Sequence, residues 1–507
     1  MTAPRAPSRR DALPLLAVLA WLAATIGVRP LMLPDEGRYV GVAWEMLQRG
    51  DWLTPTLDGL PFFHKPPLFY WITAAALRLA GPVEWAARAA PLLGAGVGAA
   101  ALYGLLLRWC GRGPARQALL VLAAQPLFYL GGQFANMDML VAGCITAAVC
   151  LLADAVLRLE AGLPPRWALL GAWLAAALGV LAKGLIGAVL PALVIMAWLA
   201  LSRRLRLLPR LLPLPGLLLF AAVVLPWFAA MQQRHAGFLD EFFVVQHLQR
   251  YAAGGFNNVQ PPWFYPLLLL AAFLPWLPWL WRAARAVDEP GRHEAPSLRL
   301  LMLVWAALVV AFFSLPRSKL IGYVLPAVPP LAALAAHGFA ATVGGRRGWI
   351  AAAALGAVVG AGIVLGLGLH PVRSTKPLAL ALGAARQPGE PVLMLQGYRF
   401  DLPFYARLEQ PAGVVDDWGN PEIARRDDWR RELAEAGRFS PRDAAARLIA
   451  PAALPAVLCA APRSWVVGPA SAARAQPLLA QAAVAAADGE LRLWRVEPRA
   501  AASGGPC

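Results

Sequence analysis

Ionisable side chains gather in four short stretches that lie beside long apolar runs of this 507-residue chain. Charged groups are costly to place in lipid, so those next to apolar segments usually face a cavity and mark a functional site. The four stretches together hold carboxylates, cations, histidines and tyrosines. Such a set can bind a phosphate group and move a proton, and it therefore predicts a phosphate-handling cavity.

The first stretch, DEGRY, follows directly on the first apolar run and holds Asp35, Glu36, Arg38 and Tyr39. Two carboxylates beside a cation are candidates for acid and base chemistry. A solvated helix start is the alternative, because carboxylates stabilise a helix N-terminus.

The second stretch, FFHKPPLFYW, sets His64 and Lys65 between aromatic residues and two prolines. Lys65, held by Pro66 and Pro67 at a membrane surface, is what a lipid phosphate requires, since an ammonium group acts as a point charge for phosphate. A lysine that only reaches toward lipid headgroups is the alternative.

The third and fourth stretches lie farther along the chain. Asn136 and Asp138 occupy a turn between two apolar runs, where an N-cap aspartate is the alternative to a catalytic one. His247 and Arg250 are three residues apart and would share a helix face. Near the end of the apolar region, Arg317, Lys319 and Tyr323 flank a short turn.

The elements that position these stretches are predicted to be membrane helices. The chain is 59% hydrophobic and 15% charged, whereas soluble proteins average about 45–50% and about 25%, which excludes an ordinary soluble enzyme. Runs near 20 residues predict an α-helical polytopic protein with eleven crossings, within a range of about 11 to 13. The predicted crossings are 11–28, 89–107, 118–134, 139–157, 167–182, 184–202, 211–230, 263–281, 300–315, 320–339 and 349–369.

The net charge of +17 follows from this topology and requires no nucleic acid partner. Eighteen of the 46 Lys and Arg residues lie in six short connections on one side, which the positive-inside rule predicts to be cytoplasmic together with the N-terminus. The four ionisable stretches then face the opposite, outer side. The six connections hold Arg5, Arg9, Arg10, Arg108, Arg112, Arg116, Arg158, Arg166, Arg203, Arg204, Arg206, Arg210, Arg282, Arg285, Arg292, Arg299, Arg346 and Arg347.

Two domains are expected: a membrane domain over 1–369 and a polar outer domain over 370–507. Residues 31–88 are predicted to form one long outer loop with helices along the membrane surface, because the apolar run at 66–80 is short for a crossing. The first apolar run is expected to stay as an anchor, since no A-x-A-like cleavage site follows it. Cys459 and Cys507 would share an oxidising compartment and could form a disulfide bond.

In order, the motifs DEGRY, EMLQRGDWLTP, FFHKPPLFYW, Asp138, FFVVQHLQRY and SKLIGYVLP resemble the bacterial aminoarabinose transferase and protein O-mannosyltransferase family of GT-C glycosyltransferases. The resemblance runs from about residue 12 to 340. The segment EPVLMLQGYRFDLPFYARLEQPAGVV predicts strand, helix and strand, and looks like the outer α/β domain of the aminoarabinose branch.

The resemblance implies a bacterial inner-membrane enzyme with a periplasmic active site and a periplasmic C-terminal domain. It would move a sugar from undecaprenyl phosphate, with inversion, to lipid A or a related glycolipid, with membrane lipids around it. By position, Asp35 looks like the catalytic carboxylate and Asp138 like the second acid, with Glu36 as a further catalytic candidate. The candidates for binding the lipid phosphate are Lys65, Arg250, Tyr323, Arg38 and Lys319, and those for lining the substrate cavity are Tyr39, His64 and Tyr70.

His64 departs from the family pattern, which usually has Phe-Glu-Lys-Pro at this point. In the aminoarabinose branch that acid and the histidine corresponding to His247 look like a metal pair, so His64 and His247 are candidate ligands for a divalent ion such as zinc. The change also leaves the sugar open between aminoarabinose and a hexosamine.

Two other functions remain as alternatives. Protein O-glycosylation from a polyprenyl-phosphate sugar would use the same donor chemistry with a Ser or Thr acceptor. A lipid or solute transporter would also explain many crossings, but transporters tend to hold polar residues near the bilayer midplane in repeated, broken helices. The polar residues here gather at one surface, which favours the glycosyltransferase.

Overall fold

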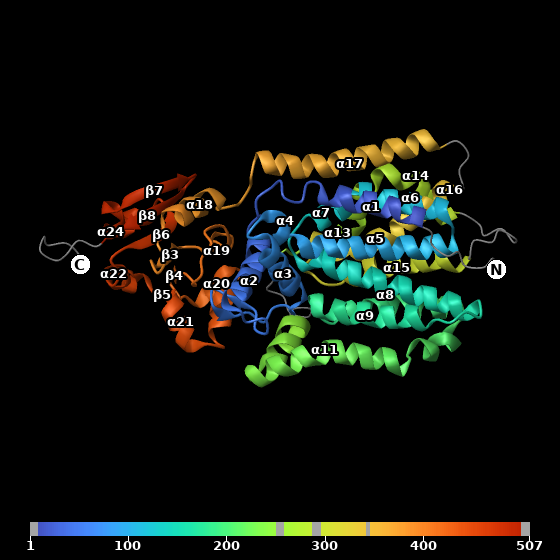
Figure 1. Ribbon diagram of the computed structural model, residues 1–507, viewed down its shortest axis with the longest axis horizontal. Coiled ribbons are helices and arrows are strands. Elements are labelled where there is room, and N and C mark those ends of the chain that lie inside the picture. Colours follow the sequence, from blue (N-terminus) through green and yellow to red (C-terminus); the bar gives the residue numbers. More distant parts are fainter. Residues whose placement is uncertain (1–8, 250–257, 286–295, 341–344, 498–507) are drawn as a thin grey trace, which may run out of the picture.

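The computed structural model describes residues 9–249, 258–285, 296–340 and 345–497. A bundle of roughly parallel helices makes up most of the molecule, and an α/β segment, called the tail below, lies at one end of it (Figure 1). A layer of short helices from the N-terminal part of the chain separates the two.

Each of the eleven predicted apolar segments contains a helix or a pair of helices, which confirms their positions along the chain. Short 3-10 and π-helical turns, η1 to η4, connect or extend several of them. The bundle consists of α1 (Arg9–Ala23), α5 (Ala89–Trp109), α6 (Arg112–Ala124), α7 (Pro126–Gly132), α8 (Met137–Glu160), α9 (Arg166–Lys183), α10 (Ile186–Leu201), η1 (Leu205–Leu211), α11 (Leu214–Arg234), η2 (Asp240–Gln249), α13 (Phe264–Ala272), η3 (Leu274–Trp276), α14 (Leu277–Arg285), α15 (Pro296–Ser314), η4 (Ile321–Ala327), α16 (Val328–Ala340) and α17 (Arg346–Leu369).

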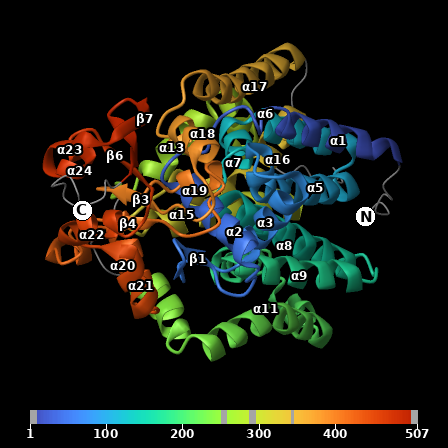
Figure 2. The same ribbon diagram turned by 60° about the vertical axis from the view of Figure 1, so that its left-hand side comes forward.

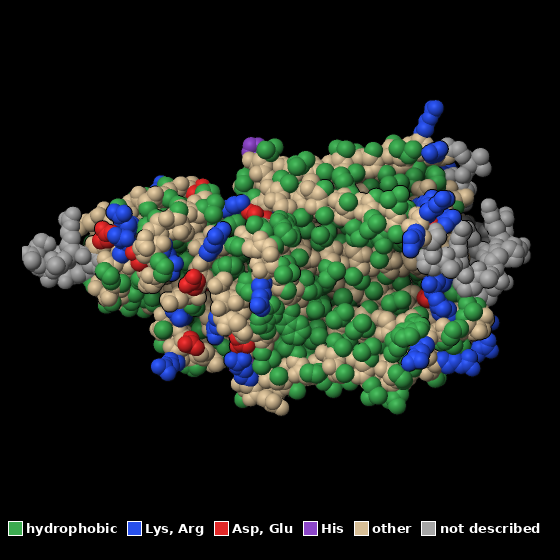
Figure 3. Space-filling view, in the orientation of Figure 1, with side chains coloured by type: hydrophobic (Ala, Val, Ile, Leu, Met, Phe, Trp, Pro, Cys, Tyr) green, Lys and Arg blue, Asp and Glu red, His purple; other side chains and the backbone are tan. Residues whose placement is uncertain are grey.

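The length and composition of the helices make this a membrane protein. In the described ranges, six helices are long and apolar enough to cross a membrane, or seven if the bent pair α13 and α14 is one span. Shorter apolar helices such as α10 account for part of the difference from eleven, so the higher number stays a prediction. The middle of the bundle is largely hydrophobic on the face in Figure 3, while Lys and Arg gather at its far end and near the tail.

Helix α8 lies inside the bundle, between α5 and α9. Small residues allow α5 and α8 to approach closely: a Cβ atom on Gly143 would lie 2.0 Å from the carbonyl oxygen of Gly94. Small residues at helix contacts favour such close packing in lipid. The N-terminus of α8, which carries Asp138, is therefore held in a fixed position relative to its neighbours.

Residues 31–88 form the layer between the bundle and the tail (Figure 1). Its apolar run at 66–80 folds mainly as one helix of 13 residues, shorter than the length that a crossing needs. Nine residues of α2 are buried, which shows that this layer is covered on more than one side. The layer contains α2 (Asp35–Arg49), β1 (Thr56–Leu57), β2 (Leu60–Pro61), α3 (Leu68–Ala80) and α4 (Glu84–Ala87).

The tail is built on a six-stranded mixed sheet in the order β5-β4-β3-β6-β8-β7 (Figure 2). The first four strands in this order pair in parallel, and β8 pairs antiparallel with β6 and β7. The predicted strand, helix and strand are confirmed as β3 (Val392–Leu395), α19 (Leu402–Tyr405) and β4 (Gly413–Val415). The other elements are α18 (Lys376–Ala385), η5 (Pro421–Ala424), α20 (Trp429–Gly437), α21 (Pro441–Arg447), β5 (Leu448–Ile449), η6 (Pro451–Ala453), α22 (Leu454–Cys459), β6 (Ser464–Pro469), α23 (Ala472–Ala475), α24 (Pro477–Gln481), β7 (Ala483–Asp488) and β8 (Leu491–Val496).

Hydrogen bonds join the tail to the layer beneath it. The amide of Leu31 donates to the hydroxyl of Tyr405 at 2.7 Å, and the indole of Trp44 donates to the carbonyl of Leu408 at 2.9 Å. These contacts are buried, so they depend on the close packing of the two parts. The predicted site residues within 31–88 consequently lie between the bundle and the tail.

Candidate active site

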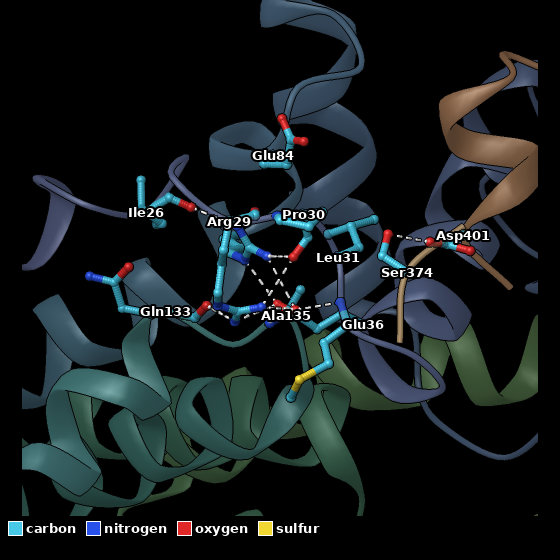
Figure 4. Close-up of polar contacts among 12 residues, drawn as sticks. Ile26, Arg29, Pro30, Leu31, Glu36, Glu84, Gln133, Ala135, Ser374 and Asp401 are labelled. Carbon is cyan, nitrogen blue, oxygen red and sulfur yellow. Dashed lines mark hydrogen bonds and ion pairs between the residues drawn. The ribbon is translucent and has the colours of Figure 1, made fainter. Parts of the chain in front are cut away.

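Glu36 lies at the centre of a closed ion-pair cluster (Figure 4). Its carboxylate accepts hydrogen bonds from the guanidinium groups of Arg29 and Arg88, and both Glu36 and Arg88 are fully buried. The backbone amides of Met32 and Ala135 donate to it at 2.9 and 2.8 Å. The cluster therefore connects the start of α2 with the turns before α5 and α8.

The environment keeps Glu36 ionised. Burial alone would raise the pKa of this carboxyl, but Arg88 and then Arg29 outweigh burial and lower it to about 2. Since both oxygens already accept two or more hydrogen bonds, this geometry favours a structural function for Glu36 over the predicted catalytic one.

Asp35 precedes Glu36 on α2 but has different surroundings. Its carboxylate pairs with Arg38, and its side chain remains 33% exposed. Arg38 also pairs with Glu432 on α20 of the tail, and its guanidinium lies over the rings of Tyr39 and Phe400. Asp35 is thus accessible and oriented by a cation that belongs to a larger network.

His64 also meets a carboxylate of α20. Its Nε2 lies 3.6 Å from Oε2 of Glu435, and its ring packs 4.3 Å from that of Phe62. Burial would raise the pKa of Glu435, but hydrogen bonds from His64 and Arg431 lower it to about 2. A carboxylate therefore does lie next to position 64, and it comes from the tail.

Asp138 stands in the first turn of α8 because Asn136 caps this helix. The side-chain oxygen of Asn136 accepts a hydrogen bond from the Asp138 amide at 3.0 Å, so Asn136 fills the capping position considered for Asp138. The Asp138 carboxylate is free for a side-chain contact and pairs with Lys183, the last residue of α9. It also accepts from Nδ2 of Asn136 at 3.2 Å.

This ion pair lines a cavity of about 290 Å³ between the ends of α8, α9, α10 and η4. The ammonium group of Lys183 lies 4.1 Å from the ring centre of Tyr323, and Lys65 lines the same cavity. Gly322 leaves space beside the carboxylate, since a Cβ atom there would lie 2.0 Å from Oδ2 of Asp138. The remaining lining is largely apolar and includes Val141, Ile145, Leu185, Ile186, Val189, Phe312, Phe313 and Pro326.

Lys183 was not among the predicted site residues, although the sequence holds a signal for it. It is the single charged residue between Arg166 and Arg203, in an otherwise apolar stretch. An ionisable residue in such a stretch predicts a cavity or a partner nearby.

The other predicted residues differ in their surroundings. Lys319 does not line this cavity; its buried ammonium donates to the carbonyls of Gln260 and Pro316 and so holds a loop together. Tyr70 is fully buried beneath α2, and Tyr39 packs on Phe69.

The predicted phosphate ligand Arg250 and the side chain of His247 lie outside the described residues. The zinc site is therefore not tested. In the described part of the chain, no three His, Cys, Asp or Glu side chains are grouped to hold a metal, and His64 faces a carboxylate instead. Cys507 also lies outside the described residues, so the predicted disulfide with Cys459 is not described.

Comparisons with known proteins agree with the motifs. Residues 64–229 match the family model described as dolichyl-phosphate-mannose-protein mannosyltransferase. The undecaprenyl phosphate-alpha-4-amino-4-deoxy-L-arabinose arabinosyl transferase of Erwinia tasmaniensis is 34% identical over 314 residues, 61% of this chain and 56% of that protein. The enzyme of the same name from Aeromonas hydrophila subsp. hydrophila is 34% identical over 331 residues, 64% of this chain and 59% of that protein. The matched region therefore spans less than two thirds of these curated relatives.

The fold is also similar to that of a solved enzyme. The crystal structure of ArnT from Cupriavidus metallidurans bound to undecaprenyl phosphate aligns with a TM-score of 0.80 and 24% identity, over 97% of this chain and 100% of that one. The predicted resemblance to the aminoarabinose transferase and protein mannosyltransferase family of GT-C glycosyltransferases is confirmed.

Proposed function

We propose that this protein is a transferase that moves aminoarabinose, or a hexosamine, from undecaprenyl phosphate to lipid A or a related glycolipid. The proposal starts from the resemblance of the chain to these GT-C glycosyltransferases in sequence and fold. The names of the curated relatives support the donor and the sugar. The match to a structure described with undecaprenyl phosphate supports a lipid carrier. Hexosamine stays in the proposal because His64, next to Lys65 in sequence, departs from the family pattern.

The observation that carries this proposal is the mixed lining of the cavity, which is cationic in one part and apolar in the rest. Lys183, Lys65 and Tyr323 offer donors and positive charge, while residues such as Ile145, Val189 and Phe313 offer an apolar surface. A polyprenyl phosphate has the matching chemistry, since its phosphate needs cations and its chain needs apolar contact.

The reaction breaks the bond between the anomeric carbon and the phosphate oxygen. The phosphate of the carrier leaves with the electron pair, and an acceptor oxygen forms the new bond from the opposite face, which inverts the anomeric carbon. Lys65 and Lys183 stabilise the charge on the leaving phosphate, and the salt bridge to Asp138 fixes the direction of the Lys183 ammonium. Arg250 is a further candidate for this function.

Asp35 acts on the acceptor. A hydroxyl acceptor loses its proton to this carboxylate as the new bond forms, whereas an ionised phosphate of lipid A needs no base and is only oriented. Arg38 holds Asp35 in place from the same helix. Glu36 maintains the position of α2 and takes no part in the chemistry.

The protein is proposed to lie in the bacterial inner membrane, with its N-terminus in the cytoplasm and 370–507 as a periplasmic domain. The arginine-rich connections support this orientation through the positive-inside rule. The cavity, Asp35 and the tail then lie on the periplasmic side, where lipid A is accessible.

Mass spectrometry of lipid A tests the proposal. Lipid A is compared from cells with the intact gene, from a deletion strain, and from the deletion strain complemented with Asp35→Ala. We expect one sugar mass to disappear on deletion and to stay absent with the variant. The mass distinguishes a pentosamine from a hexosamine. Unchanged lipid A in all three strains would reject the glycolipid acceptor.

Protein O-glycosylation is the second candidate, because the family model that matches residues 64–229 is described as a protein mannosyltransferase. It predicts the opposite pattern: unchanged lipid A and loss of a sugar from periplasmic proteins on deletion. Glycopeptide analysis of the same strains separates the two functions.

A further inference from the structure

We propose that Glu432, on helix α20 of the tail, is a positioning residue of the active site that holds Arg38 and, through Arg38, the carboxylate of Asp35. This inference rests on the proposed function, because it assumes that Asp35 acts on the acceptor. It gives the tail a direct part in the reaction.

The contacts form a chain from the tail to Asp35. Oε1 of Glu432 accepts a hydrogen bond from Nη1 of Arg38, and Nη2 of Arg38 donates to Oδ1 of Asp35. The two nitrogens belong to one planar guanidinium group, so the position of one carboxylate restricts the other. Arg38 and Glu432 are 394 residues apart in sequence, and their pairing depends on the packing of the tail against α2.

Burial makes this pairing costly to lose. The side chains of Arg38 and Glu432 are only 15% and 10% exposed. Nε of Arg38 and Oε2 of Glu432 are also buried and make no hydrogen bond within the described ranges. A buried charge without its partner is strongly unfavourable, so Arg38 stays with Glu432 as long as α20 is in place.

Arg38 lies between two carboxylates, one on each side. Burial lowers the pKa of Arg38, but nearby groups raise it above its usual value; the charge of Glu432 is the largest of these raising influences, and Asp35 adds its charge and a hydrogen bond. Arg38 is therefore held by the tail through one nitrogen and presents its second nitrogen to Asp35. Without Glu432, the guanidinium would turn fully toward Asp35 and engage the oxygen that the acceptor needs.

Helix α20 carries a second carboxylate in the same direction. Glu435 follows Glu432 by three residues, so both lie on one face of α20. This helix packs on β2 of the layer formed by residues 31–88. Glu435 lies beside His64, and Glu432 forms a salt bridge with Arg38. The carboxylates on this face of α20 thus lie beside Arg38 and His64 of residues 31–88.

The test uses the full-length purified protein, an undecaprenyl-phosphate sugar donor and lipid A. We expect Glu432→Gln to lower kcat by about 10- to 100-fold, because a small displacement of a catalytic group has effects of this size. The KM for the donor should change less than about twofold, since the donor cavity contains no residue of α20. Glu432→Asp keeps the charge and should recover part of the rate.

Two further variants separate positioning from general damage. Glu422→Gln removes an exposed carboxylate of η5, paired at the surface with Arg425, and should keep the wild-type rate. In the background of Arg38→Gln, the additional change Glu432→Gln should alter the rate less than about twofold, because Glu432 acts through Arg38. That double variant buries no lone charge and should fold even where Glu432→Gln does not.

The outcomes distinguish the two proposals. A wild-type kcat for Glu432→Gln, with Asp35→Asn inactive, would overturn the positioning function and leave the proposed transferase intact. Additive losses in the Arg38 background would also overturn it. Full transfer by Asp35→Asn would overturn the inference by removing the role of Asp35 on which it rests, and no transfer by the wild-type protein would instead reject the proposed function.

Discussion

The Glu36 cluster and the cavity beside Asp138 both pair a buried carboxylate with cations, but these groups have different access to a ligand. Glu36 is enclosed by Arg29, Arg88 and two backbone amides, and its side chain has no exposed surface. Asp138 meets Lys183 at the wall of a cavity whose lining also includes Lys65. An ion pair that is closed on all sides holds the fold together, whereas one at a cavity wall can act on a ligand.

Removing the charge of Glu36 should have the largest effect. Glu36→Gln leaves Arg29 and Arg88 buried without their counter-charge, which we expect to cost about 3–5 kcal/mol of stability. Little folded protein should be recovered after detergent extraction, as measured by size-exclusion chromatography. Glu422→Gln is the surface control, and a well-folded Glu36→Gln variant would remove the distinction between the two regions.

Asp35→Asn should affect activity and leave the fold intact. Its side chain is one third exposed, so we expect the free energy of unfolding to change by less than about 1 kcal/mol. Transfer to a hydroxyl acceptor should fall by about 100-fold or more, because the carboxylate is the only proposed base. Initial rates and thermal unfolding of the same preparation measure both effects, and a rate within threefold of wild type would argue against the assignment.

Lys183→Met should slow the departure of the carrier phosphate. We expect the transfer rate to fall about 10- to 100-fold, because one preorganised cation at the phosphate is lost. Lys376→Met is the matched control, since Lys376 pairs with Glu84 away from the cavity. Equal rates for the two lysine variants would show that Lys183 is only a partner of Asp138, and the cavity would then resemble the Glu36 cluster.

The smallest expected effect concerns Glu45, a buried acid of α2. Burial raises its pKa to about 7, although Gly59, Thr56 and Asp58 donate hydrogen bonds that lower it. The folded state therefore holds the proton more tightly than the unfolded state. The contribution to stability is fully present below about pH 4.5 and is lost as the pH rises through about 7.

We expect Glu45→Gln to reduce the fall in melting temperature between pH 5 and pH 8 by about 2 °C. Scanning fluorimetry in detergent measures the melting temperatures of the wild-type and variant proteins at both pH values. Glu36 has a lowered pKa and contributes in the opposite direction, losing stability only as the pH falls from about 4.5 toward 2. A pH dependence that is unchanged in Glu45→Gln would show that Glu45 is ionised throughout.

Much of the fold could be predicted because it follows from local patterns. The apolar runs predict the helices of the bundle, and the composition of 390–415 predicts β3, α19 and β4. The layer at 31–88 also follows, since a run of 15 apolar residues is too short to span lipid.

The site could be predicted only in part. Asp35 and Glu36 are adjacent in sequence, but consecutive residues of a helix point in directions about 100° apart, and only one of the two is buried among arginines. Asp138 and Lys65, which line one cavity, could be singled out because they stand beside apolar runs. The pairing of Arg38 with Glu432 could not be found, because no local pattern relates residues 394 positions apart.

The most direct test of the central claim is the initial rate of sugar transfer by purified protein from undecaprenyl-phosphate aminoarabinose to lipid A, followed by mass spectrometry. The wild-type protein should add one pentosamine from this donor, or one hexosamine from the corresponding hexosamine donor, and Lys183→Met should add the same sugar at a strongly reduced rate while remaining folded. Equal rates for the wild-type and Lys183→Met proteins, or transfer from a donor without the polyprenyl chain at the same rate, would contradict the claim that this cavity binds the lipid phosphate.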